Sequence, residues 1–260
     1  MITKALRTAQ LFLPGGRDRR ETISRLVRRL LGRPHEPDFF VLAYFPPNQL
    51  MLDVGANYGQ SITSMLLMRP DASVIAYEPN ADLANKVNRL FAADHRVTVH
   101  AFGLSDTSGL CNLFVPSYAD YPYPGLASLQ EEDARSWLSA DALYVFRQHK
   151  VHVARLKCEV QTLDAQKLNP YFIKIDVQGT EFNVLAGGRN TLVRCEPILM
   201  IESPGRDHRI GHLLSPLGYV EFGFEQGRLV QRQSSDMNSF FITEARQAEI
   251  LACHPDLFRR

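Results

Sequence analysis

Five acidic side chains lie at the ends of apolar, strand-like runs, a placement that suits ligand binding. The runs are LMLDV, SVIAYE, HAFGLSD, YFIKIDV and PILMIE, and the acids are Asp53, Glu78, Asp106, Asp176 and Glu202. So many carboxylates would be costly in a dry core. The carboxyl ends of parallel strands instead meet at one edge of a sheet, where ligands bind. We therefore expect these carboxylates to face a ligand.

The turn that follows the first run is the most specific of these segments. In DVGANYG, Gly55 and Gly59 permit a tight strand-to-helix turn, and Asn57 tolerates a left-handed backbone better than most residues. The backbone of Gly55, Ala56, Asn57 and Gly59 is therefore predicted to approach a cofactor. The turn resembles a nucleotide-binding loop without having the GxGxxG spacing.

The acid before this turn distinguishes between two kinds of cofactor. A dinucleotide places an anionic pyrophosphate at the following helix N-terminus, where Asp53 would repel it. S-adenosylmethionine brings cationic groups to the same place, so Asp53 favours the methyl donor. Glu78, followed by Pro79, ends the second run at close to the offset of about 20 residues at which an acid binds ribose hydroxyls.

Alternating strand and helix patterns predict the scaffold that positions these acids. Strand-like runs near residues 50, 73, 96, 171 and 197 are mostly separated by helical patterns, which predicts an α/β fold with a mostly parallel sheet. Two later runs, 219–230 and 238–243, predict an antiparallel C-terminal edge. Residues 107–163 interrupt the alternation as an insertion predicted to face the substrate.

The N-terminal residues 1–45 are predicted to form a helical extension of a domain that spans 46–260. Between residues 1 and 34, nine Lys and Arg accompany only two acids, and apolar residues recur at helical spacing in TISRLVRRLL. Two interpretations remain open. The helix packs on the domain with a solvated basic face, or it lies on an anionic membrane or covers an anionic substrate.

Bulk composition excludes several other classes. The 260 residues carry a formal net charge of +1, so no nucleic acid partner is expected. Four dispersed cysteines predict neither a zinc site nor a disulfide framework, and no run is long and apolar enough for a membrane span. A cytoplasmic location is therefore expected. The oligomeric state is left open.

The blocks LDVGANYG, AYEPN, GLSD, TLD, IKIDVQGTEFNVLAGG and PILMIE occur in this order between Leu50 and Ile242. Together they resemble the FkbM family of S-adenosylmethionine-dependent methyltransferases. The resemblance implies a Rossmann-like, seven-stranded class I methyltransferase sheet and methyl transfer to a hydroxyl of a sugar, polysaccharide or natural-product intermediate. The chain departs from the family at Gln178, where members usually carry Glu in the run DVEG.

Asp176 is the first candidate for the reaction centre, because it ends the fourth core strand beside the first one. Glu181 either points back to the same pocket or caps the helix that it begins. His208, in the loop after the fifth strand, is a further candidate base. A divalent metal is left open, with Asp176, Glu181 and Glu202 as its oxygen ligands. Lys174 is predicted to form a structural salt bridge.

Candidate acceptor-binding residues come from the insertion and from the loop after the fifth strand. They are Tyr123, Ser128, Glu202 and Arg206. Tyr123 would stack on a sugar ring or line an apolar pocket, and Arg206 would bind an anionic acceptor. Ser128 lies in a short Ser-Leu element that resembles one in family members.

Two alternatives to an O-methyltransferase remain. One is a nicotinamide-dependent oxidoreductase on a related sheet, against which Asp53 and the absent GxGxxG both count. The other is a non-catalytic module that keeps the cofactor fold and binds a partner through its basic N-terminal helix.

Overall fold

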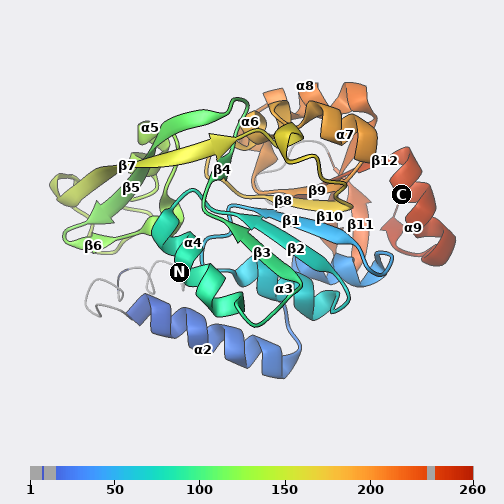
Figure 1. The fold of residues 1–260 in the computed structure, drawn as a ribbon, viewed down its shortest axis with the longest axis horizontal. Coiled ribbons are helices and arrows are strands. Elements are labelled where there is room, and N and C mark those ends of the chain that lie inside the picture. Colours follow the sequence, from blue (N-terminus) through green and yellow to red (C-terminus); the bar gives the residue numbers. More distant parts are fainter. Residues whose placement is uncertain (1–7, 9–15, 233–237, 260) are drawn as a thin grey trace.

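The computed structural model describes residue 8 and residues 16–232 and 238–259, without the side chains of 16–22 and 206. A twisted nine-stranded sheet forms its centre, in the order β13-β11-β10-β12-β9-β8-β1-β2-β3 (Figure 1). The five central parallel strands are β1 (Leu50–Val54), β2 (Ser73–Tyr77), β3 (Val97–His100), β8 (Phe172–Ile175) and β9 (Ile198–Ile201). These strands confirm the predicted α/β fold.

The C-terminal edge is antiparallel, as predicted, but it contains two more strands than the expected seven-stranded sheet would have. β12 (Ser239–Thr243) pairs antiparallel with β9 and with β10 (Tyr219–Glu225), which turns back into β11 (Arg228–Gln231). Gln226 and Gly227 at this turn both have positive φ, which suits a two-residue hairpin. β13 (Phe258–Arg259) then pairs parallel with β11. The sheet therefore has nine strands, because the hairpin return and the last residues each add one.

Helices cover both faces of the sheet and create two apolar cores. The helices are α3 (Gln60–Met68), α4 (Ala81–Phe91), α6 (Glu181–Ala186), α7 (Arg189–Cys195), α8 (Arg209–Leu214) and α9 (Glu244–Cys253). Successive strand residues point to opposite faces, so Met51 joins one core and Leu52 the other. Short 3-10 turns occur at Pro124–Leu126, Gln148–Lys150, Asp164–Gln166, Pro204–Arg206 and Ser215–Leu217.

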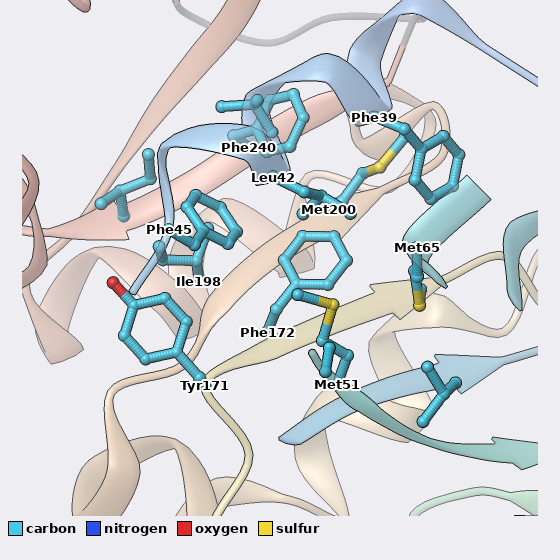
Figure 2. Packing of buried hydrophobic residues seen from close by; sticks show 14 of the residues in the cluster. Phe39, Leu42, Phe45, Met51, Met65, Tyr171, Phe172, Ile198, Met200 and Phe240 are labelled. Atoms are coloured by element: carbon cyan, nitrogen blue, oxygen red, sulfur yellow. The ribbon is translucent and has the colours of Figure 1, made fainter. Parts of the chain in front are cut away.

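Part of the segment that was assigned to the N-terminal extension belongs to the domain core. The 3-10 helix Pro37–Tyr44 inserts Phe39 and Leu42 among Met200, Phe172 and other apolar side chains of the sheet (Figure 2). Both Phe39 and Leu42 are fully buried. Aromatic and leucine side chains gain several kcal/mol from such burial, so this segment is fixed to the sheet.

The predicted strand at 96–104 is two strands in two sheets. β3 stays in the main sheet, whereas β4 (Gly103–Leu104) joins a second sheet with the order β4-β7-β5-β6. The other strands of this sheet are β5 (Gly109–Tyr118), β6 (Tyr121–Pro122) and β7 (Val151–Gln161), and α5 (Glu131–Ser136) packs against β5 and β7. The insertion is thus a β-ribbon beside the main sheet (Figure 1).

Helix α2 (Gly16–Leu31) confirms the predicted N-terminal helix but has an unexpected orientation. It lies outside α3 and α4 (Figure 1), and its apolar side chains from Ile23 onward are exposed. The interpretation of an apolar face packed on the domain is therefore wrong for the described side chains. No helix in the described part of the chain is long and apolar enough to cross a membrane.

Gly55 marks the closest approach between two neighbouring strands. A Cβ at this position would lie 1.9 Å from the carbonyl oxygen of Asp176, and the residue has φ of +91°. We expect Gly55→Ala to lower the free energy of unfolding by about 2–4 kcal/mol through overpacking and backbone strain. Thermal unfolding measures this. Gly211→Ala is the control, because no atom lies within 4 Å of its added Cβ; equal melting temperatures of the two variants would contradict the packing argument.

Candidate active site

A crevice opens where the sheet changes its direction of winding, between β1 and β8. The space between its lining residues, open solvent included, is about 590 Å³. The main sheet contributes Val54, Gly55, Asn57, Glu78, Pro79 and Asp176 to its walls. The second sheet and its loops contribute Leu104, Leu113, Ala127, Ser128 and Leu129. The insertion therefore closes one side of the crevice.

Glu78 holds the turn after β1 in place. Its Oε2 accepts a hydrogen bond from the backbone N–H of Asn57 at 2.8 Å, and its Oε1 accepts one from Asn80 N–H at 2.9 Å. Asn57 has φ of +50°, as the sequence predicted. Burial raises the pKa of Glu78 to about 7, although these hydrogen bonds act in the opposite direction. A carboxylate is thus fixed at the wall of the crevice.

Asp53 directly precedes Val54 and Gly55 of the crevice but is not itself among the lining residues, and its carboxylate has no hydrogen-bonding partner in the described part of the chain. Its side chain is 0% exposed, and neither carboxylate oxygen accepts a hydrogen bond from the described residues. Burial raises the pKa of Asp53 to about 7 against the effect of Lys174, its register partner on β8. Buried polar groups are normally satisfied. An unsatisfied carboxylate next to Val54 and Gly55 of the crevice therefore fits a cationic ligand group.

Asp176, Gln178 and Glu202 form a hydrogen-bonded chain at the carboxyl ends of β8 and β9. The Gln178 amide nitrogen donates to Asp176 Oδ1 at 2.6 Å and to Glu202 Oε2 at 2.9 Å. Lys174 Nζ lies 2.9 Å from Asp176 Oδ2, which confirms the predicted salt bridge.

The negative charge is unequally divided between the Asp176 and Glu202 carboxyl groups. Burial opposes ionisation of Asp176, but the charge of Lys174 and the hydrogen bonds from Glu202, Lys174 and Gln178 together outweigh burial and lower the pKa of that carboxyl. Burial and the neighbouring Asp176 raise the pKa of Glu202 instead. Two adjacent carboxyls rarely ionise together. The pair therefore holds one proton near neutral pH and can accept a second.

A second hollow lies beyond Gln178, on the side of α5 and α8. Its lining includes Gln178, Glu202, Trp137, Asp133 and Arg209. Gln178 also lines the crevice, so its amide stands at the boundary between the two spaces. Arg209 forms an ion pair with Asp207 and stacks on the Phe182 ring at 4.2 Å.

Glu181 stabilises the backbone before α6. Its carboxylate accepts hydrogen bonds from the backbone N–H groups of Val177 at 3.2 Å and Gly179 at 3.1 Å. Glu181 also lines the hollow that Glu202 and Asp133 line, so both interpretations of Glu181 in the sequence analysis stay open. Among the described residues, no three His, Cys, Asp or Glu side chains are arranged to hold a metal ion. Asp176, Glu181 and Glu202 thus do not form the ligand set that the sequence left open.

Ser128 and Tyr123 lie in different surroundings. Ser128 Oγ donates to the Gln178 carbonyl at 2.8 Å and accepts from Gln130 N–H at 3.1 Å, so it ties the insertion to the loop after β8. Tyr123 is buried in the insertion's own core against Tyr121 and is not among the residues that line the crevice, although the following Pro124 and Gly125 are. The expected acceptor contact of Tyr123 does not match this position, because its ring fills the insertion.

Other predicted residues lie outside the crevice lining. His208 is exposed and contacts the ring of His212, and Asp106 is exposed next to Ser105. Ala56 is in the core, and an added Cβ on Gly59 would meet Phe91 of α4. The side chain of Arg206 lies outside the described residues. These positions are close in sequence to the crevice but direct their side chains elsewhere.

Several crevice and hollow residues were missed by the sequence analysis. The apolar wall formed by Leu104, Leu113, Ala127 and Leu129 carried no chemical signal, because apolar side chains of an insertion look like ordinary core. Trp137 was also missed. Gln178 was noted only as a departure from a pattern. Its two carboxylate partners depend on the pairing of β8 with β9, which spacing alone does not give.

The fold and the site together define a doubly wound α/β protein with a cofactor crevice at its switch point. Residues 53–229 match the model of the Methyltransferase FkbM domain, more than half of the chain. The chain belongs to the FkbM methyltransferase family.

The chain is also similar to individual proteins. The chain is 28% identical over 162 residues to 2-O-methyltransferase NoeI of Sinorhizobium fredii, covering 57% of this chain and 60% of that protein, which is under two thirds of its length. A Methylobacillus flagellatus methyltransferase FkbM structure is 19% identical with a TM-score of 0.47, covering 75% of this chain and 43% of that one. Aeropyrum pernix fibrillarin with bound S-adenosyl-L-methionine is 10% identical with a TM-score of 0.39, covering 83% and 72%.

We expect Asp53→Asn to flatten the pH dependence of stability. Between its ordinary pKa of 3.8 in the unfolded chain and its pKa of about 7 in the fold, folded Asp53 keeps a proton that the unfolded chain has lost. Its stabilising contribution is complete below about pH 4 and is lost as pH rises to about 7. Urea unfolding at several pH values should show the wild-type free energy falling by a few kcal/mol more than that of the variant. An equal pH dependence of the unfolding free energy in the wild type and in Asp53→Asn would contradict this prediction.

We expect Gln178→Glu to destabilise the protein more at pH 8 than at pH 5. The change removes the amide donor and places a third carboxyl between Asp176 and Glu202, and raised carboxyl pKa values lower stability as pH rises. The melting temperature at both pH values measures the effect, expected at about 2 kcal/mol or more at pH 8. Gln148→Glu, on the surface, is the matched control. A pH-independent effect equal to that of the control would rule out the shared-amide arrangement.

Proposed function

We propose that this protein is an S-adenosylmethionine-dependent O-methyltransferase that acts on a hydroxyl of a small acceptor. The observation that carries the proposal is the unsatisfied, buried Asp53 carboxylate directly before Val54 and Gly55 of a crevice whose wall bears Glu78. Two carboxylates and an apolar wall suit a cationic nucleoside better than an anionic dinucleotide.

The chain's residues divide into three contributions toward the donor. Asp53 would balance its positive charge, Glu78 would accept hydrogen bonds from its ribose, and Leu104 and Leu113 would pack against its base. When bound in the crevice, S-adenosylmethionine would supply a methyl group on a sulfonium and leave as S-adenosylhomocysteine. The Glu78 hydrogen bonds to the turn would keep the crevice in shape before binding.

The second hollow is the proposed acceptor site. It borders the crevice at Gln178 and presents carboxyl groups of Asp133 and Glu202 together with the Trp137 ring. Carboxylates accept hydrogen bonds from hydroxyls, and an indole ring packs against the face of a sugar. A sugar, polysaccharide or hydroxylated natural-product intermediate fits this combination. The name of the relative NoeI, a 2-O-methyltransferase, also supports oxygen as the accepting atom.

Removal of the hydroxyl proton would fall to the Asp176 and Glu202 pair. The pair carries one negative charge beside Lys174 and can take one more proton, which the Gln178 amide helps by fixing both carboxyls. Holding the acceptor oxygen in line with the methyl group is the other requirement of this reaction. Asp176 is therefore the proposed catalytic residue, with Glu202 as its partner.

We expect Asp176→Ala to reduce turnover at least 100-fold, because the proton acceptor is lost. Binding of S-adenosylhomocysteine should stay within roughly tenfold, about 1.4 kcal/mol. Calorimetry measures binding, and S-adenosylhomocysteine release with a panel of sugar acceptors measures turnover. Asp256→Ala, an exposed aspartate near the C-terminus, is the control.

The same binding experiment separates the alternatives. An oxidoreductase would bind NADH in a fluorescence titration and would leave S-adenosylhomocysteine unbound. A non-catalytic module would bind the nucleoside without turnover on any acceptor. Wild-type turnover in Asp176→Ala would falsify the proposed role of that carboxylate, while retained nucleoside binding would leave the donor site intact.

A further inference from the structure

The exposed apolar face of α2 is the largest feature that the proposed function leaves unused. Its side chains are strongly exposed: Ile23 at 62%, Leu26 at 59%, Val27 at 44%, Leu30 at 78% and Leu31 at 65%. They recur at helical spacing along one side of the helix. Exposed apolar patches of this kind mark surfaces that bind a protein or a membrane.

The opposite side of α2 is polar, and its printed hydrogen bonds lie within the helix and to the residues that directly follow it. The Arg28 guanidinium donates to Ser24 Oγ at 3.1 Å and to the carbonyl oxygens of Pro34 at 2.8 Å and His35 at 3.1 Å. Arg25 and Arg28 also line a small cavity shared with Tyr58. The polar side of α2 therefore faces the domain, and the apolar side faces outward.

Basic side chains border the apolar face. A hollow beside α2 is lined by Arg25, Arg29, His95 and Arg96, with Asp94 hydrogen-bonded to Arg96. Leu90 of α4 also lines this hollow and is 38% exposed. Apolar residues next to arginines match the two zones of an anionic bilayer surface, its acyl boundary and its phosphate layer.

We propose that α2 docks this protein onto the surface of an anionic lipid bilayer, with the face formed by Ile23, Leu26, Val27, Leu30 and Leu31 inserted at the acyl boundary. This surface is defined hereafter as the α2 face. A second copy of the chain is the weaker occupant, because pairing two α2 faces would bring two sets of arginines together. An anionic surface attracts the same arginines.

Vesicle flotation with the full chain tests the proposal. We expect the protein to float with phosphatidylcholine vesicles that contain 30% phosphatidylglycerol and to bind pure phosphatidylcholine at least tenfold more weakly. Binding should weaken as salt rises from about 0.1 to 0.5 M, since screening shortens the reach of the arginines. Leu26→Glu/Leu30→Glu should reduce binding at least tenfold, and Arg29→Glu should reduce it several-fold.

The matched control is Leu110→Glu/Val193→Glu, which changes two apolar residues that are 79% and 58% exposed on other elements. It should float like the wild type. Calorimetric binding of S-adenosylhomocysteine should be unchanged in both double variants, so this test is independent of the proposed function.

Three results would overturn the proposal. The first is equal flotation of the wild type and Leu26→Glu/Leu30→Glu. The second is a wild-type dimer in light scattering that this variant abolishes, without any vesicle binding, which would assign the face to a second copy. A melting temperature several degrees lower in this variant than in the control, without vesicles, would show that the chain itself covers the face.

Discussion

The contact between Gly55 and the carbonyl of Asp176 is the constraint on which the site depends. β1 and β8 are neighbours in the sheet, and the turn after β1 passes so close to the end of β8 that a Cβ would not fit. This approach brings the end of β1, which carries the buried Asp53, next to Asp176 in the crevice wall. A single glycine therefore allows the two acids to lie at neighbouring strand ends, whereas a larger residue would separate the strands.

The electrostatic balance of the site follows from this closeness. Lys174 lies in register with Asp53 and forms an ion pair with Asp176, so one ammonium serves two carboxyls, and Glu202 adds a third. Gln178 stabilises this arrangement of carboxyl groups, because its neutral amide donates hydrogen bonds to Asp176 and Glu202 without adding charge. Buried groups of like charge are destabilising unless they are paired or protonated. The stability given up here leaves a site prepared for a cation.

The sequence predicted the parts of the fold that repeat and missed those that depend on distant pairing. Alternating apolar runs located β1, β2, β8 and β9, and the acids at their ends did mark the crevice at Glu78 and Asp176. The split of the third run between two sheets depends on the pairing of β4 with β7, which no local pattern encodes. The burial of Tyr123 likewise depends on how the insertion folds on itself. The residue types in the sequence indicate which chemistry is available, but tertiary packing determines which side chains reach the ligand.

The N-terminal helix shows the same limit in another form. Periodicity predicted an amphipathic helix at TISRLVRRLL, but it could not indicate which face meets the domain, because a helical period specifies that one face is apolar and not what covers it. In the structure, Arg25 and Arg28 on the polar side of α2 line a cavity shared with Tyr58. The apolar side therefore faces outward, at a solvation cost. Contact with an apolar partner such as a lipid bilayer would offset the cost of exposing these side chains to water. The proposed role of α2 is therefore distinct from that of the crevice.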